Sequence, residues 1–99
     1  MAKRSSYRQN KHNSYVRQLA NSLDRRGWNV KADIKGFEQP NPIGEKSKIP
    51  DILAENKEAK KIIEVETPDS ITKDKKQHET FRRSAAQQNR TSFEIKETE

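Results

Sequence analysis

The segment 49–67, IPDILAENKEAKKIIEVET, constrains the fold of this chain more strongly than any other. It contains two short apolar runs joined by a polar turn, a pattern that predicts a β-hairpin. A turn centred on residues 56–59 places Leu53 directly opposite Ile62. Because a one-residue slip would move every side chain to the other face of the sheet, this register decides which residues share a face.

Three carboxylates fall on one face of this hairpin. Asp51 lies directly opposite Glu64, and Glu66 follows on the same face because the side chains of a strand alternate. Leu53 and Ile62 share that face. The other face is wholly apolar and consists of Ile52, Ala54, Ile63 and Val65. Since both faces carry apolar side chains, we expect the sheet to be covered on both sides.

The rest of the chain shows helical and strand periodicity in turn. Residues 14–26 carry apolar side chains at helical spacing, and a second helix is expected between residues 67 and 89. Polar and apolar residues alternate over 28–35 and again over 91–98, as in strands with one buried face. The element order predicts an α/β fold with an αβββαβ core, in which helices flank a mixed four-stranded sheet.

The length of 99 residues corresponds to one small domain, to which we assign residues 14–99. Residues 1–13 are polar and lack a periodic pattern, so we expect them to form a flexible basic tail. The absence of cysteine excludes disulfides and a zinc site built on thiolates. No apolar run reaches membrane-spanning length, so we expect no membrane partner and a cytoplasmic location, nucleoid-associated or otherwise intracellular.

The chain is basic, with 21 lysines and arginines against 15 acids and a net charge of +6. We expect DNA as the partner, because neutralising phosphates releases bound counterions. Mild basicity without a functional role is the alternative. A chain this small cannot enclose a duplex, so we also expect a homodimer that places two sites on two strands.

The three carboxylates raise an electrostatic problem. Two partly buried carboxylates about 4 Å apart repel each other by about 4 kcal/mol at an effective dielectric of 20. Either one of them is protonated or a cation lies between them. Mg2+ suits the second solution: Asp51, Glu64 and the backbone carbonyl of Val65 would supply half of an octahedral shell. In the alternative, the acids face water and pair with lysines such as Lys48.

The PD dipeptide at 50–51, followed by twelve residues and the EVE tripeptide at 64–66, resembles the signature of the PD-(D/E)xK nuclease superfamily. The layout is most similar to archaeal Holliday-junction resolvases and RecB-like nucleases. The resemblance implies a restriction-endonuclease-like core and a metal-dependent endonuclease that hydrolyses DNA phosphodiester bonds with Mg2+ or Mn2+. It makes Asp51 and Glu64 the metal-binding acids. It also implies that the substrate is branched DNA or DNA that is undergoing repair or recombination.

Two further residues complete the catalytic set that the resemblance implies. The QHETF segment 77–81 resembles the Gln-x-x-x-Tyr motif of RecB-like members, which implies that Gln77 lies near the active site. Glu66 stands where the signature has lysine, and it would bind a second ion or orient the attacking water. Resolvases also tend to carry an acid in the first helix, and residues 14–23 contain none. Four lysines are expected to hold the DNA by its phosphates: Lys46, Lys48, Lys73 and Lys76.

The alternative to a nuclease is a catalytically inactive nucleic-acid-binding module on the same fold, in which Glu66 marks a dead site. A small interaction protein that touches no nucleic acid is the third possibility. The two histidines enter none of these hypotheses. His78 is expected to be a packed or half-exposed helix residue rather than a ligand, and His12 is expected to lie in the tail without a partner.

Overall fold

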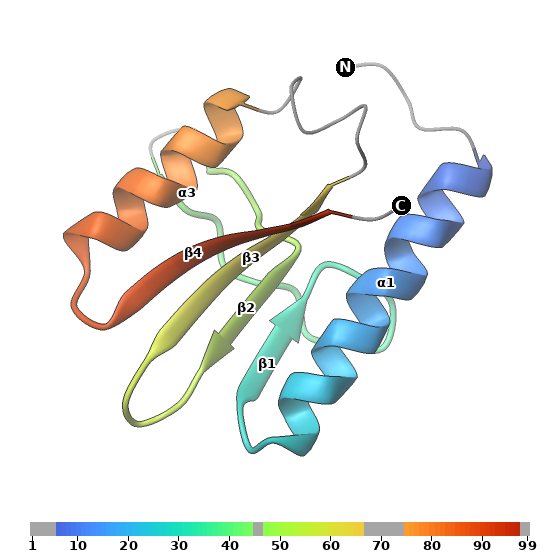
Figure 1. Ribbon diagram of the computed structural model, residues 1–99, viewed down its shortest axis with the longest axis horizontal. Coiled ribbons are helices and arrows are strands. Elements are labelled where there is room, and N and C mark those ends of the chain that lie inside the picture. The colour runs from blue at the N-terminus through green and yellow to red at the C-terminus, as the bar shows by residue number, and fades with distance from the viewer. Residues whose placement is uncertain (1–5, 45–46, 67–74, 98–99) are drawn as a thin grey trace.

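The computed structural model describes residues 6–44, 47–66 and 75–97 of the chain. Its elements are α1 (Ser6–Arg25), β1 (Asn29–Ala32), β2 (Ile52–Glu55), β3 (Lys60–Glu66), α3 (Lys75–Gln87) and β4 (Thr91–Glu97). The predicted α/β class and αβββαβ order are confirmed. Figure 1 shows α1 on the β1 side of the sheet and α3 on the β4 side.

A single four-stranded sheet in the order β1-β2-β3-β4 forms the centre of the fold (Figure 1). β1 and β2 are antiparallel, and so are β2 and β3, whereas β3 and β4 are parallel. A parallel pair needs a crossover connection, and α3 lies in this one. The sheet is therefore mixed, as predicted.

The hairpin of β2 and β3 has the predicted register, in which Leu53 pairs with Ile62. Its turn is held by Asn56, whose side-chain oxygen Oδ1 accepts the backbone N–H groups of Glu58 and Ala59 at 2.8 and 2.7 Å. An asparagine that binds its own backbone in this way fixes a turn locally. The register that carries the three acids is therefore set both by the apolar pattern and by the turn.

The two helices cover opposite faces of the sheet, so both faces are buried as predicted. The α1 face is closed by one apolar cluster: Val16, Ala20, Leu23, Ala32, Ile52, Ala54, Ile63 and Val65. The α3 face is closed by a smaller cluster: Leu53, Ile62, Phe81 and Ala85. The strand residues of the two clusters alternate along β2 and β3, which is the face assignment that the sequence predicts.

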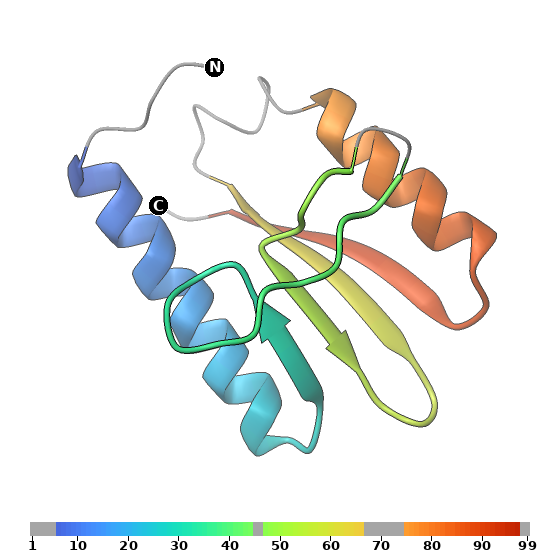
Figure 2. The ribbon, with the colours of Figure 1, turned by 180° about the vertical axis from the view of Figure 1, so that it is seen from behind.

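The long loop between β1 and β2 runs across the molecule toward α3 (Figure 2). Ile43 and Lys48 form an isolated antiparallel bridge within it, and Ile43 packs against the α3-face cluster. Gly44 has a φ of 79°, and a Cβ at this position would come within 2.6 Å of the Thr80 Cγ2 atom of α3. A glycine is therefore required where the loop passes the helix.

Helix α1 begins at Ser6, so the expected flexible tail is wrong for residues 6–13. The apolar stripe starts only at Val16, but His12 lies one turn earlier and is 4% exposed. A buried polar side chain extends the packed face of a helix without contributing to hydrophobic periodicity, which is why the pattern places the start too late. Neither α1 nor α3, within the described ranges, is long and apolar enough to cross a membrane.

Candidate functional site

Three carboxylates gather at one end of the sheet, where β2 begins and β3 ends. Asp51 immediately precedes β2, while Glu64 and Glu66 lie in the last three residues of β3. The antiparallel pairing brings the start of one strand next to the end of the other. The hairpin thus places all three acids at the same end of the sheet that α1 and α3 cover.

Asp51 is held by its main chain and by His12. Its carbonyl oxygen accepts the N–H of Asp33, and its Oδ2 atom accepts the N–H of Val65 at 2.8 Å. Nε2 of His12 lies 3.3 Å from the same Oδ2 atom. Burial alone would raise the pKa of Asp51, but the hydrogen bond and positive charge of His12, followed by hydrogen bonds with Glu64 and Val65, hold that pKa below its usual value.

Glu64 is 1% exposed and contacts both Asp51 and helix α3. Its Oε2 atom accepts the backbone N–H of Asp51 at 2.9 Å, and its Oε1 atom accepts the Nε2–H of Gln77 at 2.5 Å. Burial, followed by the negative charge of Asp51 and a side-chain hydrogen bond with it, raises the pKa of Glu64 to about 9. At neutral pH Glu64 is therefore protonated, and the two acids share one proton.

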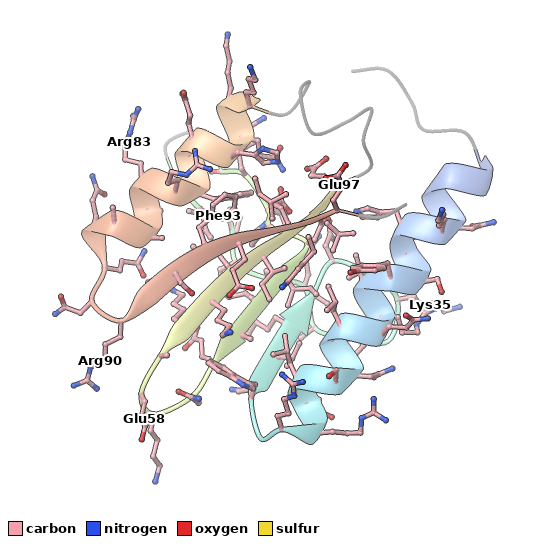
Figure 3. All side chains as sticks on the ribbon, viewed as in Figure 1. Lys35, Glu58, Arg83, Arg90, Phe93 and Glu97 are labelled. Atoms are coloured by element: carbon pink, nitrogen blue, oxygen red, sulfur yellow. The ribbon has the colours of Figure 1, made fainter. Side chains whose placement is uncertain are left out.

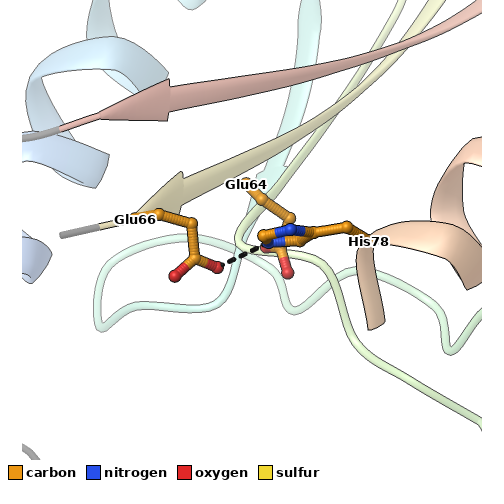
Figure 4. A group of neighbouring side chains, drawn as sticks. All are labelled: Glu64, Glu66 and His78. Atoms are coloured by element: carbon orange, nitrogen blue, oxygen red, sulfur yellow. Dashed lines mark hydrogen bonds and ion pairs between the residues drawn. The ribbon is translucent and has the colours of Figure 1, made fainter. Parts of the chain in front are cut away.

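Glu66 is 2% exposed and pairs with a histidine of α3 (Figure 4). Its Oε1 atom lies 2.9 Å from Nε2 of His78, which is itself 4% exposed. Glu64 lies on the same face, and one ligand atom from each of these three side chains falls within 4.8 Å of the other two. The chemistry of this group suits a metal ion, although a lysine stands at the position of Glu66 in the signature that the sequence resembles.

The acids do not face water, so the water-exposed alternative is wrong. Glu64 and Glu66 are almost completely buried, and Asp51 is only partly exposed. Each acid instead has a polar side chain from a helix beside it: His12 for Asp51, Gln77 for Glu64 and His78 for Glu66. Burying a carboxylate is costly unless it is paired and hydrogen-bonded, and the two helices provide those partners.

The structure brings together the residues expected to form the catalytic set. Gln77 contacts Glu64 directly, and Asp51 and Glu64 are neighbours. Val65 lies between the two glutamates; because its N–H points toward Asp51, its carbonyl also points to the β2 side of the strand. Of the four lysines, Lys48 is half-buried in the loop bridge and Lys76 is exposed beside Gln77. Lys46 and Lys73 lie outside the described residues.

Sequence reasoning missed the two histidines. His12 was expected in a tail without a partner, and the structure corrects this by placing it in α1 against Asp51. His78 is packed in its helix as expected, yet it also reaches Glu66. The usable signal was its position directly after Gln77. A helix that places one side chain next to the acids also places the adjacent residues close to them.

No protein-family model, curated protein or solved structure matches this chain.

Proposed function

We propose that this chain is a divalent-metal-dependent phosphodiesterase that cleaves DNA, with Asp51 and Glu64 as the acids that hold the ion. One observation carries the proposal: the hairpin packs two acidic side chains together in a largely buried place, where Glu64 is 1% exposed and its Oε2 atom lies 2.9 Å from the backbone nitrogen of Asp51. Such a pair contributes little to folding, because burial opposes its ionisation and the two groups repel each other. An arrangement that is costly for stability is typical of functional sites.

The donor atoms at this place fit Mg2+ or Mn2+. They are carboxylate oxygens of Asp51 and Glu64, together with the backbone carbonyl of Val65 on the same side of β3. Oxygen donors are the ligands that both ions prefer. A divalent cation would also relieve the repulsion that the shared proton now relieves, and metal binding would release that proton.

The chain's own residues have distinct roles in this proposal. A bound ion lowers the pKa of a water ligand and neutralises charge that develops on the phosphate. His12 holds the Asp51 carboxylate by its Oδ2 atom, and Gln77 holds Glu64 by its Oε1 atom. Fixing a ligand from a second residue typically raises metal affinity about 10- to 100-fold. Glu66 is proposed to act through metal as well, since it cannot supply the positive charge of a lysine.

The choice of DNA rests on charge and on the resemblance of the PD and EVE segments to PD-(D/E)xK nucleases. The net charge of +6 favours a polyanion, and the αβββαβ order agrees with the core that the resemblance implies. Lys48 and Lys76, with Lys46 and Lys73 outside the described residues, are proposed to hold phosphates. We further propose a homodimer acting inside the cell on branched or repair-associated DNA.

A catalytically inactive nucleic-acid-binding module is the second candidate. The observation that favours it is that each of the three acids already has a polar protein partner, so the charges are compensated without an ion. In this reading, Glu66 and His78 form a structural pair that replaced a catalytic lysine. Such a module would bind DNA and leave it uncut in every divalent metal.

Cleavage of supercoiled plasmid and of branched DNA, across a series of Mg2+ and Mn2+ concentrations, tests the proposal. We expect the wild-type chain to cut, and we expect Asp51→Asn or Glu64→Gln to reduce the rate by at least about 100-fold while DNA binding persists. Glu58→Gln is the matched control, because Glu58 is exposed at the opposite end of the same hairpin (Figure 3). A wild-type chain that binds DNA but cuts neither substrate would establish the second candidate.

Glu66 is tested in the same assay with two substitutions. Glu66→Gln should lower the cleavage rate strongly, because a neutral amide is a poor metal ligand. Glu66→Lys should retain part of the activity, because it restores the charge that the signature carries. Equal rates for wild type and Glu66→Gln would show that Glu66 has no part in the reaction.

A further inference from the structure

A second group of ligand atoms lies on the α3 face, beside the Asp51–Glu64 pair. It consists of Glu64 and Glu66 from β3 and His78 from α3, which face one another in Figure 4. All three residues are at most 4% exposed. The group differs from the Asp51–Glu64 pair in one chemical respect, because it offers an imidazole nitrogen next to two carboxylates.

The spacing of these atoms is close to that of ligands around one small ion. Ligand atoms about 2.1 Å from a metal lie about 3.0 to 3.4 Å apart when they occupy neighbouring octahedral or tetrahedral positions. His78 Nε2 and Glu66 Oε1 are already 2.9 Å apart, and all three ligand atoms lie within 4.8 Å of one another. Only a small movement of the longer contacts is needed for a common ion.

We infer that Glu64, Glu66 and His78 form a binding site for a borderline transition-metal ion, with Zn2+ or Co2+ as its representatives. Imidazole binds such ions much more readily than it binds Mg2+, which prefers oxygen and keeps its waters. Three protein ligands also leave a fourth position open, as in metal sites that bind water or substrate. The ion would replace the proton between His78 and Glu66.

A purely structural role does not account for the whole group. A hydrogen bond between His78 and Glu66 explains why those two side chains lie together. It does not explain why a third titratable side chain, Glu64, points into the same buried space, where each additional carboxyl is costly. A metal ion accounts for all three at once. The site shares Glu64 with the proposed nuclease centre, but its metal binding stands whether or not the chain cuts DNA.

Titration of the metal-free full chain with Co2+ and with Zn2+ tests the inference. We expect one equivalent of Co2+ to produce visible d–d absorption, Zn2+ to displace it, and a 100-fold excess of Mg2+ to leave it unchanged. His78→Gln and Glu66→Gln should each weaken Zn2+ binding by at least about 100-fold. The matched control is Glu79→Gln, which removes an exposed carboxylate from the same helix and should bind like wild type. Absence of stoichiometric binding by the wild type overturns the inference.

A measurement on the unaltered protein covers the case in which a variant fails to fold. The chain has only two histidines, one in each described helix. In the proton NMR spectrum of the Co2+ complex, a coordinated imidazole shows strongly shifted ring signals, and we expect them from His78. Shifted signals from His12 instead would place the ion on Asp51 and overturn the inference.

Asp51→Asn separates this inference from the proposed nuclease activity. It removes an acid of the nuclease centre and should abolish cleavage, yet Co2+ should still bind through Glu64, Glu66 and His78. A wild-type chain that binds Co2+ in this way and never cuts DNA would retain the metal site and reject the nuclease. A chain that cuts with Mg2+ and ignores Co2+ and Zn2+ would do the reverse.

Discussion

Among the residues that the structure describes, the α1 face of the sheet buries eight apolar residues in one cluster, whereas the α3 face buries four and, in the same layer, places Glu64, Glu66 and His78. The polar group takes the end of the face that the apolar cluster does not fill. Phe93 lies between the two groups, with its ring centroid 6.0 Å from that of Phe81 and 6.0 Å from that of His78. One face therefore supplies more apolar burial, and the other combines a smaller core with ionisable side chains.

In this chain of 99 residues, one face of the sheet mainly stabilises the fold and the other carries the candidate site. A small domain has little apolar area to give up, so a face that hosts buried acids must be supported by the opposite one. Each buried acid also costs free energy unless it is paired. The apolar burial on the α1 face thus offsets the free-energy cost of the buried acids on the α3 face. Substitutions that act on one face at a time test this division.

The largest effect is expected from two neighbouring core residues that point to opposite faces. Ile52 packs in the α1-face cluster and Leu53 in the α3-face cluster. Ile52→Ala and Leu53→Ala should each destabilise the fold by about 2–5 kcal/mol, with the larger loss for Ile52 because its cluster is more extensive. Urea unfolding of both variants measures the two losses. A larger loss for Leu53→Ala would show that the α3 face, and not the α1 face, contributes more to stability.

The second effect is a pH dependence that belongs to the α3 face. The pKa of Glu64 is about 9 in the folded protein against 4.5 in the unfolded chain, so between these values the folded state holds a proton that the unfolded state has lost. Metal-free stability should therefore fall as pH rises from 5 to 8. Glu64→Gln mimics the protonated form and should remove this decline, for a relative gain on the order of 2 kcal/mol at pH 8.

Unfolding in the presence of a chelator, at pH 5 and at pH 8, measures this effect in both proteins. The window stays above the range in which Asp51 titrates, since the pKa of Asp51 is lowered below 3.8. The contribution of Asp51 is therefore constant and cancels. Parallel pH profiles for wild type and Glu64→Gln would show that Glu64 is ionised in the folded protein at neutral pH.

The sequence is sufficient to predict the architecture because the relevant signals are local. The hairpin register follows from two apolar runs and a turn, and the structure confirms the pairing of Leu53 with Ile62. The distribution of Ile52 and Leu53 to opposite faces follows from alternation alone. The start of α1 could not be predicted, because its first turns are polar and His12 is buried by contact with a distant residue.

From the residues alone the site could be predicted only as far as the carboxylates, while Gln77 was added by the resemblance of its segment to a known motif. Asp51 and Glu64 belong to one hairpin, so their approach is a matter of strand pairing. The histidine partners, His12 of Asp51 and His78 of Glu66, come from helices on opposite faces and lie 39 and 12 residues away from the acids that they contact. Which side chain of a helix meets which acid depends on how that helix packs on the sheet. Such contacts are properties of the tertiary structure and leave no mark in periodicity.

A smaller effect is expected from His12, through which α1 makes a polar contact with Asp51. His12→Gln removes a positive charge from Asp51, whose pKa should rise toward the value that burial alone dictates. The carboxylate contributes stability above its unfolded pKa of about 3.8, so the variant should lose about 1 kcal/mol at pH 6 and progressively less below pH 4. A double-mutant cycle with Asp51→Asn isolates the pair. A coupling energy of zero would show that His12 does not stabilise the Asp51 carboxylate.

The smallest effect concerns the outer surface of the two helices and decides which face meets DNA. Lys76 is exposed in the first turn of α3, directly before Gln77, while Arg25 is exposed in the last turn of α1. Arg25 stabilises its helix, because a cation there complements the negative end of the helix dipole, whereas Lys76 opposes the dipole of α3. The helix dipole therefore accounts for a cation at the position of Arg25, but it does not account for a cation at the position of Lys76. Arg25 also lies about 20 Å along the helix axis from His12.

DNA binding measured across a range of salt concentrations distinguishes these two residues. Lys76→Ala should weaken binding by about fivefold at 0.1 M salt and lower the slope of log affinity against log salt by about 1, because one phosphate contact is lost. The same variant should be as stable as wild type or slightly more stable. Arg25→Ala should leave the slope unchanged and destabilise the fold by a few tenths of a kcal/mol, about 0.5. An unchanged slope for Lys76→Ala together with a reduced one for Arg25→Ala would move the DNA-binding surface to the α1 side, away from the acids.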